Sequence, residues 1–268
     1  MKRLIKIEWA KFKKNNVIIL LLTFFCLFLP ACLYFGSIIP ELPAFLPQKE
    51  SLFQFPSIWD YLGYAGNWMT FFFLGVLAIY LVTIEINNKT LRQSIINGLS
   101  RQEYYFSKVI SITIISLLAT FYFALISIIV GIFNSDSFSI SVIFDNDFAI
   151  LRFFLMSFAY LSFALFLAFI IRKSGIAVFF YISYVIIIEP LLRYIIINNL
   201  SSEGYTNYFP LNAIEDLMPN PIYRYAEAVP NNIDFEFLLT FKTSAILTFI
   251  YTALFLGISY WSFIKRDI

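Results

Sequence analysis

Long apolar runs alternate with short polar segments along most of the chain. Six of these runs are close to the roughly 20 residues that a helix needs to cross the hydrocarbon core of a bilayer. The predicted spans are Val17–Ile39, Tyr64–Ile84, Val109–Phe133, Phe148–Ile171, Ile176–Ile197 and Thr243–Ile264. Because they occupy about half of the 268 residues, the pattern predicts an all-α membrane protein with one transmembrane domain over residues 1–268.

The first sixteen residues have a different, amphipathic pattern. Apolar Leu4, Ile5, Trp9 and Phe12 are separated by lysines. Such a segment is typical of a helix that lies in the membrane surface, with its apolar side in the acyl region and its basic side toward headgroups. We therefore expect an interfacial helix over 1–16. A second interpretation, compatible with the first, is a basic flank that only sets the orientation of the first span.

The segments on the opposite side of the membrane are unequal in length. Pro40–Gly63 is short and contains Trp59 and Tyr61, which are typical interfacial anchors. The longer segment Asn198–Lys242 is interrupted by prolines, and its stretch 211–218 places apolar residues on one helical face. We expect a short outer cap before the sixth span, containing a helix at the membrane surface.

Composition and charge agree with this topology. The chain is 60% apolar and 13% charged, whereas soluble domains have about 25% charged residues. Of the 19 Lys and Arg residues, 14 fall on the side of the N-terminus if the spans alternate. Cytoplasmic loops hold this excess, so the sequence predicts that both termini are cytoplasmic in a plasma membrane, a bacterial cytoplasmic membrane being expected. The net charge of +2 does not indicate binding to nucleic acid.

The polar segment 85–108, between the second and third spans, predicts a short helix under the membrane. Leu91, Ile95, Ile96 and Leu99 form an apolar stripe, with Arg92, Gln93 and Asn97 on the other side. Asn88 or Thr90 can cap its start, and Gly98 suits a left-handed residue at its end. Ser100 and Glu103 then have the spacing of a capping box that begins the next helix, and Lys108 is expected to reach up to the membrane interface. An ordinary amphipathic loop remains the alternative.

The fifth span contains the only charges that lie clearly inside an apolar run. Glu189 and Arg193 are four residues apart and can pair on one helical face, while Pro190 removes a backbone hydrogen bond between them. One interpretation is a broken helix near the outer exit of a transport pathway. The other is a structural ion pair close to the outer surface.

Several kinds of chemistry are excluded by missing residues. The chain has no His, no GxxxxGK[ST] phosphate loop and no GxSxG nucleophile elbow. Its two cysteines, Cys26 and Cys32, both lie in the first span and have no metal-binding spacing. We expect no catalysis, no metal site and no cofactor on this chain, so the energy for uphill transport would come from a partner.

The segment 85–108 resembles the type-2 ABC transporter permeases. Their pattern is an acid at the end of the second span, a Thr-Leu step, a small-residue turn, Ser-Arg and a later Lys. Here those positions are Glu85, Thr90-Leu91, Asn97-Gly98, Ser100-Arg101 and Lys108. The chain departs from the commonest form with Gly-Leu before Ser100, where Pro is frequent, and with Lys89, where Gly is frequent.

The resemblance implies a transport subunit rather than an enzyme. It implies an interfacial N-terminal helix, six spans and a coupling helix between the second and third, with a second permease subunit, identical or related, and cytoplasmic ATPase subunits that bind ATP and Mg. The residues expected to couple the chain to the ATPase are Glu85, Thr90, Leu91, Arg92, Ile95, Gly98, Ser100, Arg101, Glu103 and Lys108.

The direction of transport and the substrate are open from the sequence. Aromatic, apolar spans favour export of an amphipathic substrate, such as a lipid, a lipid-linked molecule or a peptide, and contact with membrane lipids. A self-contained carrier or channel, or an accessory membrane protein, remains the alternative.

Overall fold

The computed structural model describes residues 8–9, 11–13, 15–38, 49–135, 148–200, 204–221 and 238–266. Within these ranges the chain is helical, without strands. Six helices are long and apolar enough to cross a membrane, as predicted. They are α2 (Asn16–Ile38); α3 (Ser57–Met69), η2 (Thr70–Gly75) and α4 (Val76–Asn87) as the second span; α6 (Arg101–Asn134); α8 (Ala149–Ile171); α9 (Ser174–Ser183), η3 (Tyr184–Ile188) and α10 (Glu189–Leu200) as the fifth; and α13 (Phe241–Lys265).

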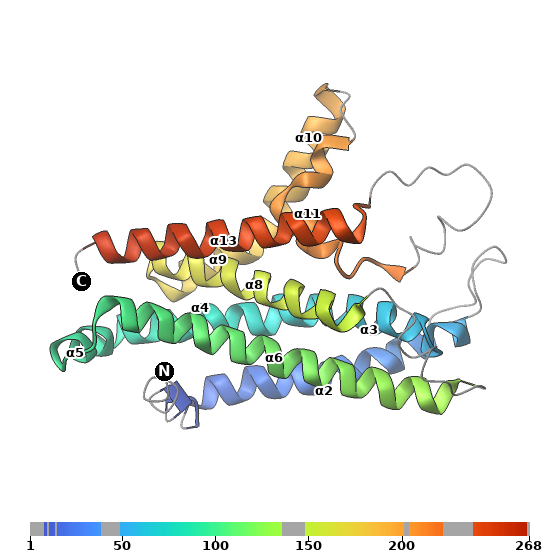
Figure 1. The fold of residues 1–268 in the computed structure, drawn as a ribbon, viewed down its shortest axis with the longest axis horizontal. Coiled ribbons are helices and arrows are strands. Elements are labelled where there is room, and N and C mark those ends of the chain that lie inside the picture. The colour runs from blue at the N-terminus through green and yellow to red at the C-terminus, as the bar shows by residue number, and fades with distance from the viewer. Residues whose placement is uncertain are drawn as a thin grey trace.

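Short helices lie at the two ends of the bundle. One end, which we call the α5 end, carries α5 (Thr90–Ile96) and the C-terminal end of α13 (Figure 1). The opposite end, the α11 end, carries η1 (Lys49–Phe53), η4 (Gly204–Tyr208) and α11 (Pro210–Glu215). The fifth span turns away from the bundle between α9 and α10 (Figure 1), at the position where η3 precedes Pro190.

The fourth span, α8, is at the centre of the bundle. It packs against α4, α6 and α13, and its apolar side chains fill the core; the rings of Phe123 and Phe153, for example, stack with centroids 4.1 Å apart. In contrast, α2, the fifth span and α13 have most of their most apolar stretch exposed. These exposed faces are apolar, as expected of helices that contact lipid.

The second span begins seven residues before the predicted start at Tyr64, at Ser57. Trp59 is therefore not an interfacial anchor: only 1% of it is exposed, and its ring packs edge-on against Phe123. Tyr61 lies in the same helix and donates a hydrogen bond to the carbonyl of Cys32, 2.6 Å away. The prediction of an exposed loop up to Gly63 was wrong because these aromatic residues pack against α2 and α6.

Two spans contain a stretch of π-helix. In the second span this is η2, and in the fifth it is η3. The side chain of Tyr181 lies on Gly75 so closely that a Cβ at that position would be 2.0 Å from the tyrosine hydroxyl oxygen. Its ring also stacks on Phe71, with centroids 5.1 Å apart. Tyr181 of the fifth span thus packs on the π-helical stretch of the second span, beside the contact of α9 with α4.

Candidate functional site

The helix expected between the second and third spans is present as α5. It is preceded by Lys89 in a left-handed conformation, with φ of 58°, and followed by Gly98 with φ of 94°. The prediction for Gly98 is confirmed, and Lys89 occupies the position at which the resembled family frequently has Gly. The left-handed conformation costs a residue other than glycine about 1–2 kcal/mol. Lys89 adopts it nonetheless, at the tight turn between α4 and α5.

Side chains fix both ends of this connection. At the start neither Asn88 nor Thr90 caps α5 through its side chain; the Thr90 hydroxyl instead donates to the carbonyl of Glu85, 3.2 Å away. At the end the predicted capping box is present: Ser100 Oγ accepts from the N–H of Glu103 at 3.1 Å, and Glu103 Oε2 accepts from the N–H of Ser100 at 2.9 Å. The helix is therefore joined to α4 and α6 by short, hydrogen-bonded turns.

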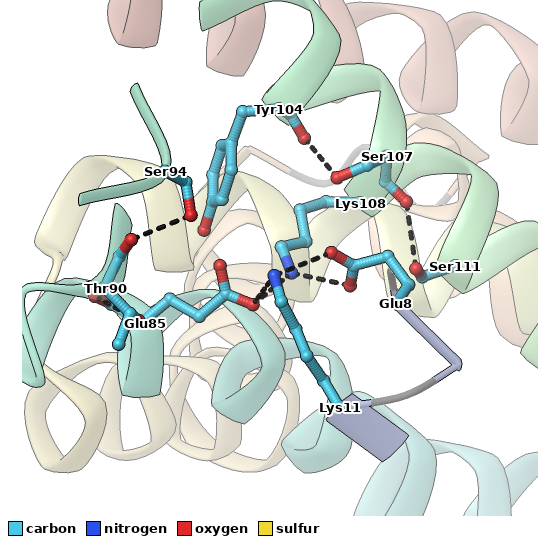
Figure 2. Close-up of polar contacts among 9 residues, drawn as sticks. All are labelled: Glu8, Lys11, Glu85, Thr90, Ser94, Tyr104, Ser107, Lys108 and Ser111. Carbon is cyan, nitrogen blue, oxygen red and sulfur yellow. Dashed lines mark hydrogen bonds and ion pairs between the residues drawn. The ribbon is translucent and has the colours of Figure 1, made fainter. Parts of the chain in front are cut away.

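Next to α5, four charged side chains form a cluster in which each is bound to two others (Figure 2). Lys108 Nζ lies 2.7 Å from Glu8 Oε2 and 2.7 Å from Glu85 Oε1. Lys11 Nζ lies 2.8 Å from Glu85 Oε1 and 3.1 Å from Glu8 Oε1. The cluster, hereafter the charged cluster, joins residues 8–11 to the end of α4 and the start of α6.

The charged cluster is neutral in sum and mostly buried. The side chains of Lys108, Glu8 and Glu85 are 1%, 8% and 8% exposed. Burial acts to raise the pKa of Glu8, but the ammonium groups of Lys108 and Lys11 outweigh it, and the pKa lies below its ordinary value. Burial likewise acts to lower the pKa of Lys11, and the two carboxylates reverse this effect and raise it. Glu8 and Lys11 are thus both held in their charged forms.

We predicted that Lys108 reaches to the membrane interface, and it does not. It points into the bundle because two carboxylates lie there, and its ammonium group also lies 5.2 Å from the ring centroid of Tyr104. Glu85 and Lys108 came from the sequence pattern, whereas Glu8 and Lys11 were missed. Their only signal was an acid among the basic residues of an amphipathic segment. Most of the predicted interfacial helix over 1–16 lies outside the described residues.

The outward side of α5 differs from the predicted stripe in one residue. Leu91 is buried, and Ile95 and Leu99 pack against the core. Ile96 is instead 76% exposed, beside the exposed side chains of Arg92 and Gln93. These three residues, the exposed face of α5, occupy positions i, i+1 and i+4 of one helical face.

Arg101 has an intramolecular role. Its Nη1 donates to the carbonyls of Ile264 and Arg266, both 2.9 Å away, and so binds the C-terminal end of α13. Arg266 in turn donates to the carbonyl of Ile170 at the end of α8. Cationic side chains stabilise helix C-termini in this way, and the contacts connect the start of α6 to two further spans.

At the α11 end, Glu189 and Arg193 both contact the segment around α11. The Glu189 carboxylate accepts from the N–H groups of Leu211 and Asn212, at 3.0 and 2.7 Å, and so caps the start of α11. Arg193 donates to the side chains of Asn212 and Asn207. Among the described residues no ion pair joins Glu189 directly to Arg193. The two charges are on one helical side, as predicted, but the polar atoms of the 204–221 segment separate them.

Arg152 is a further residue of this end that the sequence analysis did not single out. It is 5% exposed, donates to the carbonyl of Leu217 at 3.2 Å and lies 3.6 Å from Asp60 Oδ1. Its guanidinium is also 3.8 Å from the ring centroid of Phe241. Arg152 therefore holds α11 and its following turn against the second, fourth and sixth spans.

The comparisons with known proteins give a family. The family model described as ABC-2 family transporter protein matches residues 4–188, which is more than half of the chain. No curated protein matches the sequence. The chain belongs to the ABC-2 transporter family, whose members are membrane-spanning transport subunits, and it is a multi-pass membrane protein.

Proposed function

We propose that this ABC-2 family chain is the permease subunit of an ATP-driven exporter in a bacterial cytoplasmic membrane. It works as a pair with a second permease subunit, identical or related, and is powered by separate cytoplasmic ATPase subunits that carry ATP and Mg. The α5 end faces the cytoplasm, and the substrate is amphipathic. Family membership supports the class of transporter. The excess of Lys and Arg at the α5 end supports its orientation, and the aromatic, apolar spans favour an amphipathic substrate.

The observation that carries the proposal is the construction of α5. One side of this short helix is exposed and has an arginine, an amide and a large apolar side chain: Arg92, Gln93 and Ile96. Such a mixture is typical of protein interfaces, in which apolar contact is combined with multidentate arginine bonds. The other side is fixed to the bundle through Leu91. A helix of this kind can bind a partner protein through its exposed face, and it moves together with the bundle to which it is fixed.

Movement of α5 would be passed on to the spans by the charged cluster. A displacement of α5 pulls on Glu85 through the Thr90 bond, and Glu85 is bound to both lysines of the cluster. Lys108 lies on α6, which also holds the ends of α13 and α8 through Arg101 and Arg266. Closure of the ATPase subunits would therefore move several spans together rather than bending one loop.

The test is to change the exposed face of α5 and measure coupling. With Arg92→Glu and Ile96→Ser combined, we expect the chain to insert and fold normally, because both side chains are exposed. The reconstituted complex should keep basal ATP hydrolysis on the partner but lose stimulation by substrate and lose transport. The measurement is ATPase activity with and without substrate, alongside substrate efflux from vesicles.

A matched control is Gln102→Glu, which changes an exposed residue near α5 but outside its exposed face. It should leave coupling unchanged. Unimpaired transport by an assembled Arg92→Glu, Ile96→Ser complex would show that α5 is not the coupling helix. Failure of an ATPase to copurify with the wild-type chain in mild detergent would count against the whole proposal.

A further inference from the structure

A cavity of about 460 Å³ lies between the first and third spans at the α5 end. Glu8, Trp9, Phe12 and Lys13 line its mouth, α2 and α6 form its two walls, and Leu74 of η2 completes the lining. Its volume is in the range of small-molecule sites, which are about 300–1,000 Å³. The cavity is separate from the exposed face of α5 and from the polar contacts at the α11 end.

The lining changes from polar to apolar with depth. Lys13, Trp9 and Glu8 lie at the mouth, Ser107 and Ser111 follow on α6, and the deeper α6 wall is apolar from Ile114 to Ala119. From Ser107 to Tyr122 the wall runs about 22 Å along the helix axis. This exceeds half of the roughly 30 Å hydrocarbon core of a bilayer, so the cavity is long enough for one acyl chain.

Tyr122 bounds the far end of the cavity, and the mouth is positive. Tyr122 donates a hydrogen bond to the carbonyl of Cys26, 2.6 Å away, which joins α6 to α2 at that depth. At the mouth both oxygens of Glu8 are bound to the lysines of the charged cluster. Lys13 is exposed and makes no ion pair with any of the described residues. The unbalanced charge at the mouth is therefore positive.

We propose that this cavity binds one anionic phospholipid of the leaflet at the α5 end. The acyl chain lies between α2 and α6 and ends below Tyr122, and the phosphate lies beside Lys13. Trp9, which is 66% exposed at the mouth, has the amphipathic ring that favours the headgroup region. The polarity gradient, the depth and the positive mouth each match this ligand. The proposal requires neither ATP nor a partner ATPase.

The test uses the full chain in phosphatidylcholine vesicles with a trace of phosphatidylglycerol that carries a photoactivatable group at the end of one acyl chain. After irradiation, mass spectrometry maps the adducts. We expect them on the lining residues Leu118 and Tyr122 rather than on Leu117 and Phe121, which belong to the same stretch of α6 but do not line the cavity. Equal labelling of both sets would show an ordinary boundary lipid and would overturn the proposal.

Two substitutions sharpen the result. Ile114→Trp fills the cavity and should lower the cavity adducts about tenfold, the effect of removing roughly two methylene groups from apolar contact. Leu117→Trp adds the same ring at a residue that does not line the cavity and should leave them unchanged. If Ile114→Trp disturbs folding, as judged by gel filtration, the smaller change Ala119→Leu replaces it. Undiminished adducts in a folded cavity variant would contradict the proposal.

Selectivity for charge provides an independent readout. Lys13→Gln should lower the preference for labelled phosphatidylglycerol over labelled phosphatidylcholine about fivefold, as expected for one lysine near an anionic headgroup. Lys173→Gln, at an exposed lysine outside the cavity, should not. An unchanged preference in Lys13→Gln would contradict the headgroup position.

Discussion

Lys108 is a buried ammonium group whose position depends on two carboxylates from distant parts of the chain. Removing such a charge leaves its partners buried and unpaired. This strongly destabilises the folded chain, because a buried charge without a partner has lost its hydration and gained nothing in return. The same holds for Glu8 and Glu85, since each binds both lysines. At the scale of single residues, the charged cluster therefore behaves as one unit rather than as four separate contacts.

A double-mutant cycle tests this unit. Lys108→Met should destabilise the chain by about 3–5 kcal/mol because Glu8 and Glu85 then share only Lys11. Glu8→Gln added to Lys108→Met should recover part of the loss, since it removes one unpaired charge. The measurement is denaturant unfolding in micelles, and Lys173→Met serves as the control at an exposed lysine. Strictly additive effects would mean that the two residues act independently.

Local patterns in the sequence predicted local contacts, whereas no pattern indicated the distant ones. The capping box of Ser100 and Glu103 and the left-handed Gly98 depend on neighbours within three residues, so spacing sufficed. The contact between Glu8 and Lys108 spans 100 positions. Nothing in either neighbourhood specifies it, and the apolar context of Lys108 favoured the wrong direction. Lys89 is a third case: it stands where the resembled family frequently has Gly, and its backbone is left-handed, with φ of 58°.

Among the elements, the segment 204–221 is held at the α11 end by carboxylates and backbone N–H groups. Asp216 accepts from Leu239 N and from Asn212 Nδ2, both at 3.0 Å, and so joins this segment to the start of α13. Burial raises the pKa of Asp216 to about 7, with a smaller contribution from Glu215 and against the effect of the Leu239 N–H. The sequence predicted a short helix here but not these bonds.

This shift predicts how stability depends on pH. Because the folded chain binds the Asp216 proton more tightly than the unfolded chain, the group favours folding below about pH 4, and this contribution is lost as pH rises through about 7. Thermal unfolding in micelles should therefore move to lower temperature between pH 5 and pH 8. Asp216→Asn should flatten the slope, while Glu50→Gln, an exposed carboxylate in η1, should not. A slope unaffected by Asp216→Asn would refute the assignment.

For the whole molecule, the two ends of the bundle differ in kind. The α5 end joins α6, α8 and α13 by arginine contacts with helix carbonyls and adds the charged cluster. The α11 end joins the second, fourth and sixth spans through Arg152, and Glu189 of the fifth span caps α11. The six spans could be predicted because each is an apolar run long enough to cross a bilayer. Their packing could not, since the burial of Trp59 and the π-helical stretch at Gly75 depend on which rings meet.

Orientation is testable for the whole molecule in intact cells. With Cys26 and Cys32 replaced by serine, Asn97→Cys at the α5 end should react with a membrane-impermeant maleimide only after permeabilisation. Tyr208→Cys, at an exposed residue of η4, should react without it. The expectation rests on the excess of Lys and Arg at the α5 end. The reverse accessibility would invert the proposed topology and remove α5 from the reach of a cytoplasmic ATPase.

The charged cluster also sets an order for biosynthesis. Glu8, Lys11 and Glu85 leave the ribosome before Lys108, so the first two spans enter the membrane carrying two acids and one lysine. Only when the third span follows does Lys108 supply the missing positive charge. Until then Glu8 and Glu85 have only Lys11 as a partner within the cluster. Synthesis of the third span is therefore the step that completes the charged cluster and joins residues 8–11 to α6.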